Sequence, residues 1–254
     1  MRSRHLNTLP LLAGLALVQP AAPRAEAISF VQLPAPAGTA QLVLPAEGHA
    51  PAPLVLVMPD ALGEEGRAEA YVVALAARGI ATLVVGLDGD PELPQPPRDR
   101  ASEAAVVAVA QAWALGQAGL RAEGRIGVLG FGAGARGALA APAAGPTVAL
   151  YPGCAGLELP TWRPVLVLQG DDAPDAPACA ALEEPPAASI QALRGAGHAW
   201  DARPGAEGRG DRIPAPDGEG RVLAKPDAQA TARAAVLVAG WFTQQFGLGR
   251  AVRP

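Results

Sequence analysis

Short apolar runs alternate with helix-like stretches along most of the chain. PLVLVM (53–58) is a short continuous apolar run, as expected for a strand covered on both faces of a sheet. Five later runs are further strand candidates: IATLVVG (80–86), RIGVLG (125–130), TVALYP (147–152), PVLVLQG (164–170) and SIQALRG (189–195). Two earlier runs, ISFVQLP (28–34) and TAQLVLP (39–45), are separated by the turn-forming APAG and predict an antiparallel hairpin.

Helical patterns lie between and after these runs, at about 66–78, 101–118 and 228–246. In the second helix we expect an inward face formed by Ala104, Val107, Ala108, Ala110, Ala114 and Leu115, with Trp113 beside it. The alternation predicts an α/β fold with a doubly wound, mostly parallel sheet and helices on both faces. Residues 201–227 are rich in Gly, Pro, Asp and Arg and predict a long loop, and no linker divides residues 28–254, which we expect to form a single domain.

The first 27 residues have the pattern of an export signal. Arg2 and Arg4 precede the apolar stretch 9–18, and the small-x-small sequence at 25–27 predicts cleavage after Ala27. Cleavage leaves 17 basic and 23 acidic residues, a net charge of −6. An acidic chain with no basic run argues against nucleic acid as a partner, and no later segment has the length and hydropathy of a membrane span. We therefore expect a periplasmic or secreted protein.

Two cysteines, Cys154 and Cys179, are the only ones in the chain. An oxidising compartment permits a disulfide between them, and the alternative is two separate buried thiols. The sequence does not predict a metal site, because soft ligands are few and the Asp-rich stretch lacks the spacing of a calcium loop. No phosphate-binding G-x-x-x-x-G-K-[ST] loop is present either, so we expect no cofactor.

Polar residues follow several predicted strands, where the ligand crevice of such a sheet lies. His198 in GAGHAWD follows the last run, and a neutral imidazole there is suited to act as a general base. The alternative for His198 is a structural histidine bonded to a backbone carbonyl. The loop GDDAPD offers Asp171, Asp172 and Asp175 as acids that orient this histidine, and we select Asp172. The alternative for these residues is ordinary turn chemistry.

The stretch IGVLGFGAG (126–134) has the form of a strand–turn–helix elbow, but Gly132 stands where a nucleophile would be. Gly130, Gly132 and Ala135 also fit the dinucleotide pattern G-x-G-x-x-[GA]. That pattern normally opens the first βαβ unit and is followed after about 20 residues by an acid, which is missing here. A pseudo-elbow whose helix N-terminus binds a small anion is the better interpretation.

The motifs LGFGAGA, LYPGC, VLQGDD followed by PAC, and GAGHAWD resemble, in this order, the landmarks of dienelactone hydrolases of the exported bacterial branch. The resemblance spans about residues 40–246 and implies an α/β-hydrolase fold acting on small esters or lactones. It implies a Cys154–Cys179 pair and an acid at Asp60 that contacts the nucleophile. It also implies an oxyanion hole formed by the backbone N–H groups near Ala61 and at Ala133.

The departure from the family is the glycine at 132, which has no side chain to attack a carbonyl. Ala135 replaces the second glycine of the family's pair, and the bulky Arg136 follows. We expect a pseudo-hydrolase that binds a small ester, lactone or anionic ligand with impaired or absent covalent catalysis. The alternative is a weak ester or lactone hydrolase that uses water activated by His198.

Overall fold

The computed structural model describes residues 27–46, 51–60, 66–86, 100–122, 126–204 and 211–248. Within these ranges, nine strands form one mixed sheet with the order β1-β2-β4-β3-β6-β7-β8-β9, and β5 pairs with β3 beside this path. The strands are β1 (Ala27–Gln32), β2 (Thr39–Leu44), β3 (Ala52–Met58), β4 (Ala81–Val85), β5 (Leu120–Arg121), β6 (Gly127–Phe131), β7 (Thr147–Leu150), β8 (Val165–Gly170) and β9 (Ala188–Leu193). The first two pairings, β1 with β2 and β2 with β4, are antiparallel, and the remaining pairings are parallel. The predicted hairpin and the predicted parallel sheet are both confirmed.

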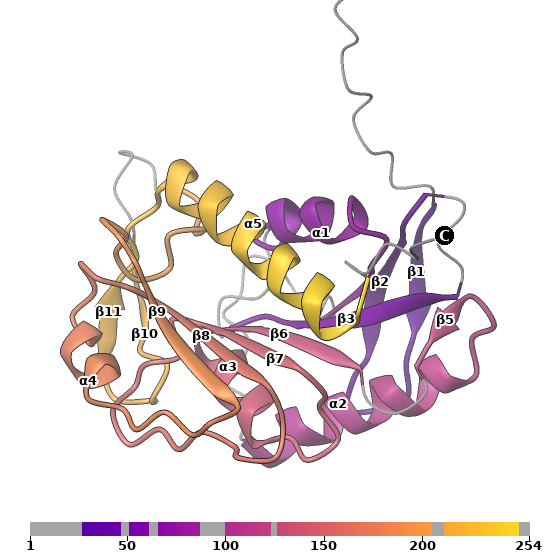
Figure 1. The fold of residues 1–254 in the computed structure, drawn as a ribbon, viewed down its shortest axis with the longest axis horizontal. Helices are drawn as coiled ribbons and strands as arrows, with labels where there is room; N and C mark the ends of the chain where they lie inside the picture. Colours follow the sequence, from indigo (N-terminus) through magenta and orange to yellow (C-terminus); the bar gives the residue numbers. More distant parts are fainter. Residues whose placement is uncertain are drawn as a thin grey trace, which may run out of the picture.

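Helices cover both faces of this sheet (Figure 1). They are α1 (Glu69–Ala76), α2 (Arg100–Leu115), α3 (Gly132–Ala140), the short α4 (Ala176–Ala180) and α5 (Ala228–Gln245). Helices α1 and α5 lie together on one face, and α2 and α3 lie on the other (Figure 1). The doubly wound α/β architecture is therefore confirmed.

Strand β3 illustrates why its run is apolar throughout. Val55 and Val57 pack into the hydrophobic cluster that contains residues of α1 and α5. Leu54 and Leu56 point to the opposite face and pack with residues of α2. Because both faces of the strand are covered, its residues are all apolar and do not alternate with polar ones.

Two sequence predictions need correction. In α2 the buried side chains include Val106, Val107, Ala110 and Ala114, whereas Ala108 and Leu115 are exposed. Leu115 is the last residue of the helix, where no neighbouring element covers it enough to bury it, and its exposed fraction is 58%. The predicted long loop 201–227 contains an antiparallel pair, β10 (Arg212–Pro214) and β11 (Arg221–Leu223).

The predicted export signal at 1–27 lies outside the described residues except for Ala27, the first residue of β1, and it stays a prediction. Among the helices in the described ranges, none combines the length and the hydropathy that crossing a membrane requires.

Candidate active site

The turn between β6 and α3 has the sharp geometry of a nucleophile elbow. Phe131 ends the strand in an extended conformation, and Gly132, the first residue of the helix, has a φ of +49°. This left-handed conformation strains any residue that has a Cβ atom. A Cβ atom built on Gly132 would lie 3.2 Å from the Cβ atom and 3.4 Å from Oδ2 of Asp60. The elbow therefore directs its central position at Asp60, and a Cβ atom there would fit only with a small shift of the Asp60 side chain.

The flanking glycines serve a different purpose from Gly132. A Cβ atom on Gly134 would lie 2.2 Å from the backbone oxygen of Pro59, and one on Gly130 would lie 2.4 Å from Cα of Ala135. Backbone atoms at such short distances exclude any side chain, so these two glycines allow α3 to begin directly against the sheet. Packing explains Gly130 and Gly134, but it does not explain the absence of a side chain at Gly132.

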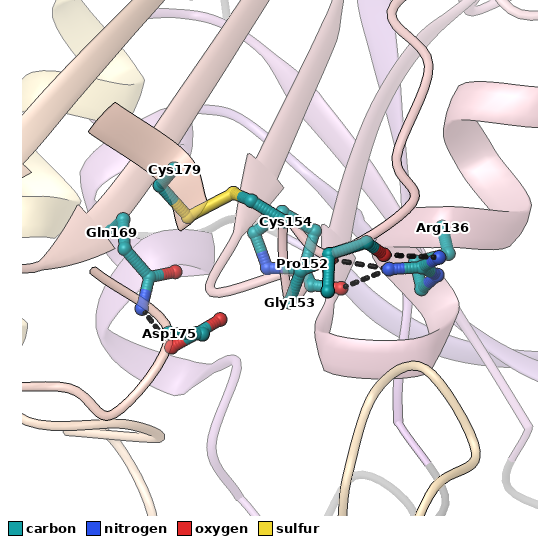
Figure 2. Close-up of a disulfide and its surroundings, with 8 residues drawn as sticks. Arg136, Pro152, Gly153, Cys154, Gln169, Asp175 and Cys179 are labelled. Atoms are coloured by element: carbon teal, nitrogen blue, oxygen red, sulfur yellow. Dashed lines mark hydrogen bonds between the residues drawn. A yellow bond between two sulfur atoms is a disulfide. The ribbon is translucent and has the colours of Figure 1, made fainter. Parts of the chain in front are cut away.

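Arg136, which follows the elbow in place of a small residue, is accommodated by the loop after β7. Its guanidinium group donates hydrogen bonds to the backbone oxygens of Pro152, Gly153 and Ala155 (Figure 2). The same loop continues to Cys154, which forms the predicted disulfide with Cys179 of α4. The disulfide prediction is thus confirmed, and Arg136 and the disulfide hold this loop from two sides.

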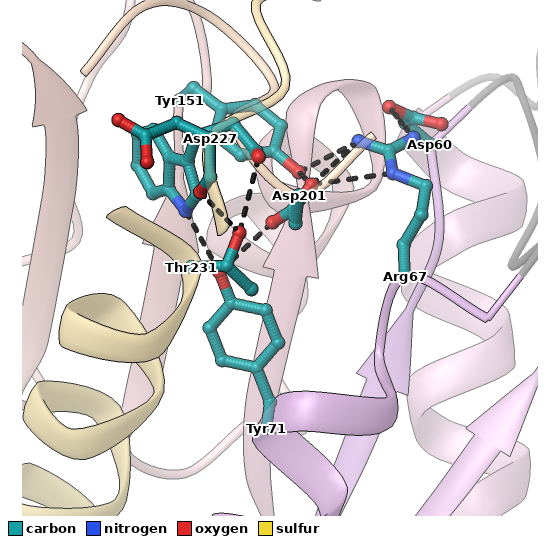
Figure 3. A network of polar contacts seen from close by, with 8 residues as sticks. Asp60, Arg67, Tyr71, Tyr151, Asp201, Asp227 and Thr231 are labelled. Carbon is teal, nitrogen blue, oxygen red and sulfur yellow. Dashed lines mark hydrogen bonds and ion pairs between the residues drawn. The ribbon is translucent and has the colours of Figure 1, made fainter. Parts of the chain in front are cut away.

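Asp60 lies just beyond the carboxyl end of β3 and forms a buried ion pair with Arg67. The distance between Arg67 Nη1 and Asp60 Oδ2 is 2.7 Å, and the two side chains are 3% and 7% exposed. Arg67 also donates to Asp201, the last residue of GAGHAWD, from Nε at 3.3 Å and from Nη2 at 3.1 Å. One guanidinium group thus joins two carboxylates that lie far apart in the sequence (Figure 3).

Two tyrosines complete this buried network around Asp201. The Tyr151 hydroxyl donates to Asp201 Oδ1 at 2.6 Å, and the Tyr71 hydroxyl donates to Oδ2 at 2.9 Å (Figure 3). The indole N–H of Trp200 donates to the Tyr71 oxygen at 2.9 Å. Burial raises the pKa of the Asp201 carboxyl, while Arg67 and the two tyrosine donors act to lower it. Burial also raises the pKa of each tyrosine, so both hydroxyls keep their protons at neutral pH.

The backbone is strained where this network meets the site. Tyr151 has a φ of +37° and Ala199, beside His198, has a φ of +49°. Neither residue is a glycine, and such conformations persist only where the surroundings fix them. The hydroxyl bonds of Tyr151 and the packed Trp200 side chain, which is 1% exposed, supply this constraint.

His198 lies beside the network but forms no hydrogen bond through its side chain. It is 1% exposed, and its ring packs edge-on against Tyr151 at a centroid distance of 4.9 Å. Within the described part of the chain, neither ring nitrogen has a hydrogen-bond partner. Burial lowers its pKa from 6.5 to about 4; nearby Asp60 acts to raise the pKa, and Arg67 acts to lower it. The imidazole is therefore neutral at pH 7, and it is a weak base because its pKa lies well below that pH.

Each of the candidate acids has a partner other than His198. Asp171 Oδ1 accepts a bond from the backbone N–H of Gly195 at 2.6 Å, and Asp172 pairs with Lys225 at 2.7 Å. Asp175 accepts a bond from Gln169 at 2.7 Å, and burial raises its pKa. The role of Asp172 as the acid that orients His198 stays a prediction, and in this structure no hydrogen bond joins the two side chains.

The segment 211–227 covers the histidine loop. The backbone N–H groups of Lys225 and Asp227 donate to the carbonyls of His198 and Trp200 at 2.8 and 2.7 Å. His198 also forms a parallel bridge with Ala224. Asp227 then caps α5 by accepting bonds from the N–H groups of its first turn. The return of the chain into α5 is thereby fixed against the histidine loop and buries His198.

The proposed oxyanion donors are described only in part. Ala61 lies outside the described residues, and Ala133 is the second residue of α3 and is partly exposed. Its N–H group belongs to the first helical turn, where N–H groups lack intrahelical partners and favour negative charge. Within the described ranges, no group of three or more His, Cys, Asp or Glu side chains is arranged to bind a metal ion.

Sequence reasoning missed Arg67, Tyr71, Tyr151 and Asp201. Arg67 gave no signal because nearly all basic residues of the chain are arginines. A usable signal was the scarcity of tyrosine: the chain has two, and both donate to Asp201.

Comparisons with known proteins place the fold. No family model matches the sequence, and no curated protein matches it significantly. A dienelactone hydrolase-like promiscuous phosphotriesterase from metagenomic libraries is 18% identical, with a TM-score of 0.62 over 86% of this chain and 98% of that chain. For a dienelactone hydrolase from Anabaena variabilis the identity is 18%, the TM-score 0.56 and the coverage 88% and 98%. An α/β serine hydrolase without a lid from Xanthomonas campestris is 14% identical, with a TM-score of 0.56 over 90% of this chain and 98% of that chain. These structures establish the α/β-hydrolase fold for this chain.

Proposed function

We propose that this protein is a dienelactone hydrolase-like pseudo-hydrolase, which binds a small ester, lactone or anionic molecule without forming a covalent intermediate. The observation that carries the proposal is the elbow at Gly132. It keeps the left-handed backbone and the direction toward Asp60 that a nucleophile would use, yet it holds no side chain. Without a nucleophile the covalent route of acyl transfer is closed at this position.

The surroundings of His198 support the same proposal and disfavour the alternative of activated water. A general base works best when its pKa is near the working pH, and burial lowers the pKa of His198 to about 4. The base of a triad also needs an acid that fixes its tautomer, and the ring nitrogens of His198 have no such partner.

The ligand would bind where the carboxyl ends of the parallel strands meet, beside Asp60 and the start of α3. The N–H of Ala133 and the positive end of the α3 dipole favour a carbonyl oxygen or an anion there. The binding roles of Asp60, Ala61 and Ala133 belong to this proposal. The Cys154–Cys179 disulfide and the signal-like sequence at 1–27 support a periplasmic or secreted location.

The test is hydrolysis of 4-nitrophenyl acetate and of a small lactone by residues 28–254, beside the His198→Ala variant. We expect equal rates for the two proteins. Binding of the lactone, followed through the backbone amide resonances, should be saturable and should shift the resonances of Gly132 and Ala133. A rate well above background that is lost in His198→Ala would overturn the proposal, and so would the absence of any saturable shift with esters, lactones or carboxylates.

A further inference from the structure

A pocket lies between α4 and the strands β8 and β9, apart from the elbow. Its volume is about 740 Å³, within the range of small-molecule sites, and Gly132, Asp60 and His198 are not among the residues that line it. Cys179 contributes to its wall, so the disulfide ties α4, and with it one side of the pocket, to the loop after β7.

The lining of this pocket divides into apolar surface and carboxylates. Ile190 and Ala192 of β9 lie opposite Ala176, Pro177 and Ala180 of α4, and these side chains offer contact to a hydrocarbon body. Among the described residues, the charged ones in the lining are Asp171, Asp172 and Glu184, and none of those that line the pocket is basic. A concave site lined by charges of one sign attracts the opposite charge.

The side-chain oxygen of Gln169 gives independent evidence that the pocket binds a hydrogen-bond donor. The residue is 2% exposed and lines the pocket, and its amide nitrogen donates to Asp175, as Figure 2 shows beside the disulfide. Its side-chain oxygen has no hydrogen-bond partner among the residues that the structure describes. A buried acceptor without a donor is costly, so a donor that reaches it would be bound favourably.

The hydrogen-bonding character of the pocket side chains is therefore one-sided. Carboxylates and the Gln169 oxygen accept, and the one donor group in this set, the Gln169 amide, already gives one of its two N–H groups to Asp175. Lys225 neutralises Asp172 only from an exposed position, where ion pairs are weak. We propose that this pocket binds a small organic cation, a primary ammonium group on an apolar body. This site goes beyond the ester or lactone site proposed at the elbow.

The experiment uses three probes of equal chain length, hexylammonium, 1-hexanol and hexanoate, titrated into residues 28–254 at pH 7. Amide resonances of Ile190 and Ala192 report on binding. Hexylammonium should give saturable shifts there and should bind at least about tenfold more tightly than either other probe, because it alone supplies a charged donor. Equal affinity for 1-hexanol or hexanoate, or no saturable shift with hexylammonium, would overturn the proposal.

Variants distinguish contact with the pocket from a general effect of negative charge. Glu184→Gln should weaken hexylammonium binding severalfold, whereas Glu183→Gln removes the same charge from the adjacent residue, which does not line the pocket, and should leave affinity nearly unchanged. Gln169→Leu, checked for folding by its resonance dispersion, should weaken binding as well. An equal loss in both glutamate variants would show nonspecific attraction and contradict the site.

Discussion

Gly132 faces Asp60 at close range: a Cβ atom at 132 would lie 3.2 Å from the Asp60 Cβ atom, a tight contact that a small shift of the Asp60 side chain would relieve. Asp60 in turn is fixed by its 2.7 Å ion pair with Arg67, which joins it to Asp201. The elbow thus places residue 132 beside a fixed acidic side chain, and the glycine at this position has no side chain of its own. Chemistry and scaffold are separable in this fold, because the packing of the turn depends on Gly130 and Gly134 and not on residue 132.

Alanine substitutions within the elbow should separate these roles. Gly132→Ala should cost about 1 kcal/mol, mainly from the left-handed backbone, because its Cβ atom would meet only the Asp60 side chain at 3.2 Å. Gly134→Ala should cost about 3 kcal/mol or more, because its Cβ atom would lie 2.2 Å from a backbone oxygen. Urea unfolding at pH 7 measures both, and equal losses would contradict this account.

The buried ion pairs allow a second prediction, which concerns Arg67. Arg67→Met would leave the carboxylates of Asp60 and Asp201 buried without their cation, and should destabilise the protein by about 3–5 kcal/mol. Lys225→Met removes a cation from an exposed pair, whose side chains are 45% and 66% exposed, and should cost at most about 1 kcal/mol. Chemical denaturation of the two variants gives the comparison. Similar losses for both would show that the network around Asp201 does not depend on its charge.

The sequence predicted central strands such as β3 because a strand buried on both faces must be apolar throughout. It also predicted the elbow and the disulfide, since both rest on local patterns or on the only two cysteines. The sequence could not predict the polar network around Asp201, because Arg67 and Asp201 are 134 positions apart and meet only through the tertiary fold. The partner of Asp172 was equally hidden, because Lys225 reaches it from a Gly- and Pro-rich segment whose path the local pattern does not set.

The disulfide should contribute substantially to stability. It closes a loop between positions 25 apart, and replacing both Cys154 and Cys179 by alanine should lower the free energy of unfolding by about 3 kcal/mol. Reduction of the native protein by dithiothreitol should give a similar loss, which controls for the change of side chain. A double variant as stable as the oxidised protein would contradict this prediction.

The stability of the protein should depend on pH through His198. In the folded state the pKa of His198 is about 4, and in the unfolded chain it returns to 6.5. Between these values the unfolded chain binds a proton that the folded protein excludes, so stability is lost as the pH falls from about 6.5 to about 4. The full loss below this window is about 3 kcal/mol, and at pH 5 it is about 2 kcal/mol.

The measurement is urea unfolding at pH 7.5 and at pH 5, for the native protein beside His198→Phe and His198→Gln. Phenylalanine keeps an aromatic ring against Tyr151, and it removes no hydrogen bond, because the imidazole nitrogens have no partner. Both variants should lose about 2 kcal/mol less than the native protein between the two pH values. The raised pKa of Asp201 and of Asp175 acts in the opposite direction, adding stability as the pH falls, but it is common to all three proteins and cancels in the difference. The same pH dependence in the native protein and in both variants would show that burial does not lower the pKa of His198 and that His198 is not a poor base.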